Sequence, residues 1–191
     1  MSLLLGTVLG GLGLFVWNAV SWMMLPWHHA VYRRFNDEDA VARALLAEAT
    51  VDGVYGVPAP PQKDASMDRA ARDAADMAVY DKMKAGPLVT VVFQRRGYAS
   101  IAPKLVVAMA TGMVVSFVFT LLLQSFGGNL GLIRRAALVG SGALGGILAT
   151  RLPDWNWHGF SKSFVAVQIL DMAIGCYAVG LIVGAVTMRF A

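Results

Sequence analysis

The sequence predicts a mainly α-helical membrane protein, a bundle of four transmembrane helices with a small α+β extramembrane insert between the first two. One observation is composition: of 191 residues, 57% are AVILMFWYC and 15% are charged, with a mean hydropathy of +0.59. Soluble domains are about 45–50% apolar and about 25% charged. Two further observations predict the same fold class: the sequence has four long apolar stretches, and most of its charged residues lie in one segment. This composition excludes disordered, collagen-like and disulfide-scaffold classes.

Four stretches approach the length of about 20 apolar residues that a helix needs to cross the hydrocarbon. The first runs from Leu3 to Leu25 and ends at Pro26. The third, Ala136–Thr150, is short, but it reaches spanning length if Arg134 and Arg135 extend their charged ends out of the membrane. We therefore expect one transmembrane helix within residues 1–27 and three within 100–191, at about 101–123, 132–150 and 164–188.

The first stretch has no basic segment before it and no A-x-A site after it, so it is interpreted as a retained anchor and not as a cleaved signal peptide. Basic residues near span ends favour the cytoplasmic side. Seven lie on the side of the insert and three on the other: Arg33, Arg34, Arg95, Arg96, Lys104, Arg151 and Lys162 against Arg134, Arg135 and Arg189. The prediction is a multi-pass protein of the bacterial inner membrane, with the insert cytoplasmic and both termini outside.

The polar insert, residues 28–99, holds ten of the twelve acidic residues. Capping residues, alternating apolar residues and Gly-Pro stops predict its elements. They are a helix over Ala40–Ala49 after the cluster Asn36–Asp39, a strand over Val51–Val57, a helix from Asp64 or Ser66 to Lys84, and a strand over Leu88–Phe93. The strands are expected to pair under both helices. A core of about 65 residues lined by alanine is thin, so the insert is expected to rest on the membrane, the spans or another subunit.

Small residues recur at helical spacing in each span, a pattern that lets helix backbones approach in lipid. The predicted helix-packing glycines are Gly6, Gly10, Gly112, Gly142, Gly146, Gly180 and Gly184. They favour packing within the bundle, and any that remain uncovered favour contact with another copy or another membrane subunit. The lipid bilayer and such subunits are therefore the expected partners.

Two partner classes are not expected. Gly140–Gly145 matches the pattern G-x-G-x-x-G, but it lies inside an apolar span with no preceding strand and no acid about 20 residues later, so it does not indicate dinucleotide binding. The insert carries ten basic and ten acidic residues between Arg33 and Arg96. This neutral balance, without a basic stripe, argues against nucleic acid.

Tryptophan and histidine gather at the ends of the first and third spans. The default interpretation is a belt of interface anchors, Trp22, Trp27, Trp155 and Trp157. The alternative is a metal site, because imidazole and carboxylate groups suit zinc or copper. Its candidate ligands are His28, His29, Asp154 and His158. No regular metal-ligand spacing supports it, so no cofactor is expected and copper or zinc is the alternative.

Asp171 is the single charge within the fourth span, where an ionised carboxylate is costly and usually faces a partner or water. Asn18 and Ser21 lie at i and i+3 on one face of the first span. These three residues are the candidate intramembrane polar or proton site. The structural alternative to a proton relay is a buried ion pair, for which the nearest cations are Arg151, Lys162 and the histidines, or a hydrogen bond from Asp171 to Asn18, Ser21 or a tryptophan indole.

Nothing in the sequence indicates catalysis. Cys176 lies among apolar residues, and its being alone excludes a disulfide within the chain. No G-x-S-x-G, H-E-x-x-H or Walker pattern is present. The expected function is that of a non-enzymatic accessory, scaffold or assembly subunit of a membrane complex. The alternatives are metal or proton handling at the membrane interface, and a small oligomeric transporter.

Overall fold

The structure is a computed structural model that describes residues 1–97, 99–126 and 130–190. Its contacts divide the chain into two compact units. The first comprises Met1–Arg33 and the segment that begins at Ala99, and the second is the stretch between them. Each unit is described by itself below.

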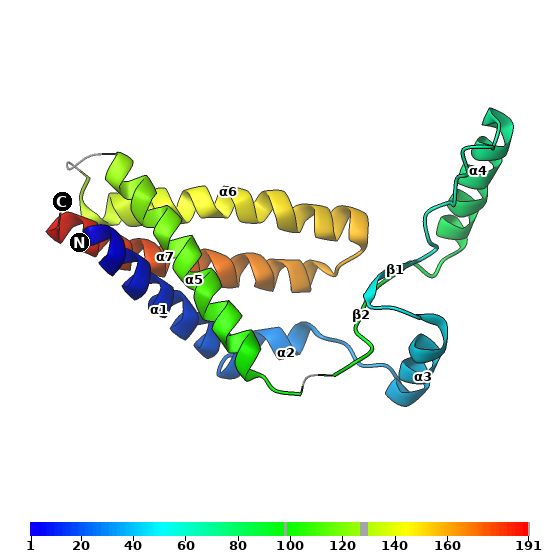
Figure 1. The fold of residues 1–191 in the computed structure, drawn as a ribbon, viewed down its shortest axis with the longest axis horizontal. Coiled ribbons are helices and arrows are strands. Elements are labelled where there is room, and N and C mark those ends of the chain that lie inside the picture. Colours follow the sequence, from blue (N-terminus) through cyan, green and yellow to red (C-terminus); the bar gives the residue numbers. More distant parts are fainter. Residues whose placement is uncertain (98, 127–129, 191) are drawn as a thin grey trace. The chain divides into compact units, whose positions relative to one another are not determined.

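The first unit contains four helices that are long and apolar enough to cross a membrane, as the sequence predicts. They are α1 (Ser2–Met23), α5 (Ala102–Ser125), α6 (Leu132–His158) and α7 (Lys162–Arg189). A one-turn helix, α2 (Trp27–Val31), follows α1 after the turn at Pro26. The start of α1 and the end of α7 lie at the same end of this unit (Figure 1).

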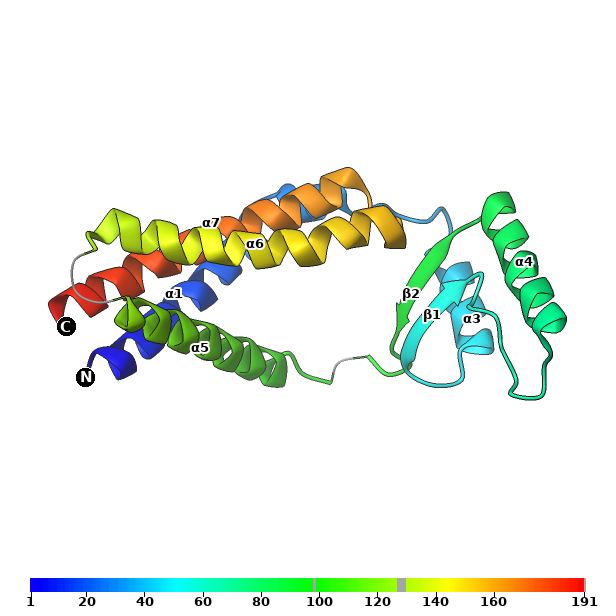
Figure 2. The same ribbon diagram turned by 90° about the horizontal axis from the view of Figure 1, so that it is seen from above.

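Helix α7 packs against each of the other three long helices of the first unit. It packs closely against α6 and α1 and less against α5, while α1 packs against α5 and α5 hardly touches α6. The views in Figures 1 and 2 show α5 running away from α6. The helices therefore form two pairs, α1–α5 and α6–α7, joined through α7. The fully buried core lies where the pairs meet, and its members are Leu123, Val139, Val179 and Val183.

Five of the seven predicted packing glycines lie where two helices approach most closely. A Cβ added at Gly10 would lie 2.8 Å from the Ser116 hydroxyl oxygen, and one added at Gly112 would lie 3.0 Å from the Gly11 carbonyl oxygen. Gly180 would meet the Ala136 backbone at 3.0 Å. A Cβ added at Gly6 would likewise lie too close to Thr120, and one added at Gly184 would lie too close to Leu132. A larger side chain at these positions would force the helices apart.

Helix α6 differs from the prediction in two respects. A Cβ added at Gly142 or Gly146 would meet no atom within 4 Å, so both residues face away from the rest of the chain. The close contact of α6 is made instead by Gly140, which lies against Tyr177. The helix also continues through Pro153 to His158 instead of ending at residue 150. A proline inside a helix costs one backbone hydrogen bond, which membrane-type helices tolerate. The actual stop is Gly159, whose φ of 73° suits glycine.

The second unit contains α3 (Glu38–Glu48), β1 (Gly53–Val57), α4 (Arg69–Ala85) and β2 (Val89–Phe93). The two strands pair, as the sequence predicts, and the structure shows that they run antiparallel with Val54 opposite Val92. The predicted start of the second helix is wrong. Asp68 caps α4 by accepting the Ala71 amide at 2.8 Å. Asp64 instead accepts the Ser66 amide in the turn before the helix.

The core of the second unit is small. Among its described residues, the buried apolar side chains are Ala49 and Phe93, the latter edge-on to Tyr55 at 6.2 Å. Contacts between either helix and the strands are few, so the expected covering of the sheet by both helices is not observed. Arg95 links α3 to the region after β2 by donating to the Leu46 and Ala49 carbonyl oxygens.

Candidate functional site

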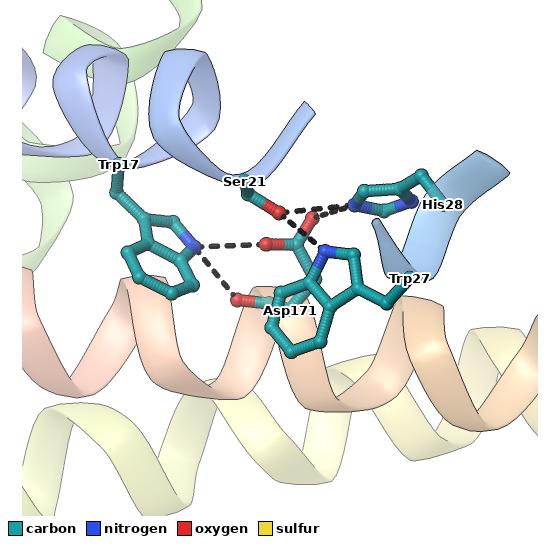
Figure 3. A network of polar contacts seen from close by, with 5 residues as sticks. All are labelled: Trp17, Ser21, Trp27, His28 and Asp171. Carbon is teal, nitrogen blue, oxygen red and sulfur yellow. Dashed lines mark hydrogen bonds and ion pairs between the residues drawn. The ribbon is translucent and has the colours of Figure 1, made fainter. Parts of the chain in front are cut away.

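A buried polar cluster joins α1, α2 and α7 in the first unit (Figure 3). It is built from Trp17, Ser21, Trp27, His28 and Asp171. Ser21 is 0% exposed, His28 1% and Asp171 4%. Burial of an acid and an imidazole in apolar surroundings is costly unless they are bonded to each other or to other partners. The cluster is the only group of the described residues that places a histidine against a carboxylate.

Local structure places these side chains. Trp17 and Ser21 are spaced i, i+4, so they lie on the same face of α1. Pro26 begins the turn into α2, which brings His28 back against the end of α1. Asp171 projects from α7 about 14 Å from the start of that helix, at about 1.5 Å per residue.

The Asp171 carboxylate is bonded on both oxygens. Its Oδ1 accepts the Trp17 indole N–H at 2.9 Å, and the same indole reaches the Asp171 carbonyl oxygen at 3.0 Å. Its Oδ2 lies 3.1 Å from His28 Nε2.

The His28 ring is stacked on Trp22 and makes hydrogen-bond contacts through one of its two nitrogens. Nε2 also lies 3.0 Å from the Ser21 hydroxyl oxygen, which accepts the Trp27 indole N–H at 3.0 Å. Trp22 stacks on the imidazole with the ring centroids 3.8 Å apart and the planes 6° apart. His28 Nδ1 is buried without a hydrogen-bond partner among the described residues.

The serine, histidine and aspartate do not form a nucleophilic triad. In such a triad the serine and the carboxylate contact different ring nitrogens, so that the imidazole can pass a proton between them. Here Ser21 and Asp171 meet the same nitrogen of His28, and Ser21 is fully buried. The arrangement suits a buried hydrogen bond between His28 and Asp171 that ties α2 to α7.

The structure does not gather the four predicted metal ligands. His28 is engaged with Asp171, while Asp154 pairs with Arg151 at 2.9 Å. His29 and His158 are exposed. No three His, Cys, Asp or Glu side chains within the described part of the chain are placed to hold a metal ion. Zinc or copper binding stays a prediction, which elemental analysis of the purified protein would test.

The cluster contains two of the three residues of the predicted polar site, together with Trp17, Trp27 and His28. Ser21 and Asp171 both belong to the cluster, but Asn18 is exposed and Trp17 takes its place. The i, i+4 spacing of Trp17 and Ser21 was the available signal.

The predicted interface anchors divide into two groups. Trp22 and Trp27 contact His28 and Ser21 in the cluster. Trp155 and Trp157 are 44% and 80% exposed, and their role as anchors stays a prediction.

Comparison with known protein families, with curated proteins and with solved structures finds no match. Function is therefore inferred from the geometry of this chain's own residues.

Proposed function

We propose that this protein is a multi-pass integral membrane protein that acts as a non-enzymatic accessory, scaffold or assembly subunit. Four helices of spanning length and composition support the location. The proposed membrane is the bacterial inner membrane, and the excess of basic residues near one set of span ends supports an insert in the cytoplasm and termini outside. The thin core of the insert supports a role in contact with other components.

The observation that carries the assembly role is the outward face of α6. Gly142, Gly145 and Gly146 lie on one face of this helix and meet no atom within 4 Å. Each glycine inside a helix is about 0.5–1 kcal/mol less favourable than alanine. Where such residues face a neighbouring helix, they permit close approach that compensates this cost. A helix of a second copy or of another subunit would supply that approach here.

The test compares two leucine variants of the full-length protein in native membranes. Gly145→Leu places a large side chain on the outward face of α6, and Ala185→Leu does the same at an exposed position of α7. Mild-detergent extraction followed by native electrophoresis should show a complex that Gly145→Leu disperses and Ala185→Leu retains, with both variants thermally as stable as the parent. A parent that runs as a lone monomer, or a complex unaffected by Gly145→Leu, would contradict the proposal.

A second candidate function is proton handling, either at this site or in a small oligomeric transporter. The observation that favours it is the His28–Asp171 pair, buried and with His28 Nδ1 lacking a partner among the described residues. Buried ionisable pairs within spans are frequent in proton relays. Liposomes that carry the protein should then show a proton flux that Asp171→Asn abolishes while folding is preserved. Absence of flux in the parent, or flux unchanged in the variant, would exclude this function.

A further inference from the structure

An apolar groove lies between α6 and α7, close to the turn that joins them. Its volume is about 340 Å³, near the lower end of the range of about 300–1,000 Å³ typical of small-molecule sites. Five of its six lining residues are apolar or aromatic, and one is basic: Leu152, Trp155, Val165, Ala166, Ile169 and Lys162. The polar cluster around Asp171 does not use any of them.

The groove is polar at one end and apolar along the rest of its length. Lys162 is the first residue of α7, and Val165, Ala166 and Ile169 follow at i+3, i+4 and i+7 on the same helix face. The apolar part therefore extends about 10 Å along the helix away from the lysine, at about 1.5 Å per residue. Leu152 and Trp155 form the opposite wall on α6.

The polar end carries an excess of positive charge. Asp154 is paired with Arg151 at 2.9 Å. No carboxylate among the described residues pairs with Lys162, whose ammonium lies 5.7 Å from the centre of the Trp155 ring. A cation over an exposed tryptophan at the end of a candidate span is typical of the level of lipid headgroups.

We propose that this groove binds an anionic phospholipid, with one acyl chain along Val165, Ala166 and Ile169 and the phosphate at Lys162. The inference rests on the proposed membrane location. The ligand must join a negative group to an apolar chain that runs parallel to α7, and a phospholipid in a bilayer has that form. The turn between α6 and α7 lies on the side proposed to be cytoplasmic, where anionic lipids are concentrated.

The test uses native mass spectrometry of the full-length protein, delipidated in mild detergent and titrated with phosphatidylglycerol or phosphatidylethanolamine of identical acyl chains. The parent should bind phosphatidylglycerol more tightly. Lys162→Gln should weaken phosphatidylglycerol binding about fivefold, since one basic residue near an anionic headgroup is worth about that factor. Lys162→Arg should retain it. Ala166→Phe, which fills the groove, should weaken binding of both lipids.

The matched control is Arg189→Gln, which removes one positive charge at the other end of α7 and should change nothing. Equal binding of the two lipids by the parent, or full phosphatidylglycerol binding by Lys162→Gln, would overturn the proposal. So would a loss of a co-purifying subunit in Ala166→Phe with lipid binding intact, because the groove would then be a protein contact. Carbonate washing of membranes separates the two proposals: protein that resists extraction but shows no lipid preference overturns the lipid site alone, whereas extracted protein overturns the membrane location.

Discussion

The bond between His28 and Asp171 should contribute measurably to the stability of the first unit. Asp171→Ala removes the carboxylate oxygens that lie within hydrogen-bond distance of the Trp17 indole N–H and of His28 Nε2. Trp17 keeps its bond to the backbone carbonyl oxygen of residue 171, and His28 keeps Ser21. Interhelical hydrogen bonds in membrane proteins contribute from about 0.6 to about 1.7 kcal/mol each, so the loss of two predicts a decrease of about 1–3 kcal/mol in the free energy of unfolding.

A double-mutant cycle isolates the shared bond. His28→Ala should lower the free energy of unfolding by about 1–3 kcal/mol, from this bond and from its stacking on Trp22, which contributes about 0.5–1.5 kcal/mol. The double variant loses the shared bond once, so the two effects should fall short of additivity. Interhelical hydrogen bonds in membrane proteins average about 0.6 kcal/mol and reach about 1.7, and the coupling energy should lie within that range.

The assay is reversible unfolding in mixed micelles of mild detergent and dodecyl sulfate, followed by tryptophan fluorescence. Asp171→Asn is the control, because its amide oxygen still accepts from Trp17 and its N–H₂ group can donate to the other tautomer of His28. The free energy of unfolding of Asp171→Asn should be about 1 kcal/mol below that of the parent, the contribution of one ordinary hydrogen bond. Strict additivity of His28→Ala and Asp171→Ala would refute the reasoning, since residues in direct contact couple.

Three further predictions concern packing, capping and the indole bonds. Gly180→Ala should lower the unfolding free energy by about 1–3 kcal/mol, because its Cβ meets the Ala136 backbone; Gly145→Ala, with open space around it, should raise it by up to about 1 kcal/mol through helix propensity. A Gly180→Ala as stable as the parent would argue against the α6–α7 contact. Asp68→Ala should cost about 1 kcal/mol of local stability and speed hydrogen exchange in the first turn of α4, and Asp64→Ala should leave that exchange unchanged. Trp17→Phe should cost about 1–2 kcal/mol in the micelle assay by removing the indole donor, whereas Trp157→Phe, at an 80% exposed position, should have no effect.

The long helices were predictable because a run of apolar residues is a local property of the sequence. Asp171 was recognisable for the same reason, since a carboxylate within such a run requires partners. The identity of its partners was only partly predictable. Whether Trp17 or Asn18 faces α7 depends on the rotation of α1, and contacts such as that of Gly10 with Ser116 fix this rotation in three dimensions.

The glycines of α6 show the same limit. Gly140, Gly142 and Gly146 are all glycines within one apolar stretch, so the sequence does not distinguish them. The packing of α6 on α7 does, because Gly140 contacts Tyr177 while Gly142 and Gly146 face outward. The end of α6 was misplaced because the apolar run stops at Thr150, whereas the helix continues through more polar residues until Gly159, with its positive φ, ends it. In the second unit, Asp64, Ser66 and Asp68 are all capping residues, and the bond to the Ala71 amide selects Asp68.

The most direct test of the four-crossing topology is a pair of reporter fusions in the full-length protein, one at Pro60 in the insert and one at Phe160 in the turn between α6 and α7. Alkaline phosphatase is active only outside the cytoplasm, and green fluorescent protein fluoresces when it folds inside. Both sites should give fluorescence without phosphatase activity, because four crossings place them on one side of the membrane and the basic residues near the span ends favour the cytoplasm for that side. Activity of opposite kinds at the two sites would contradict the topology and the lipid site with it.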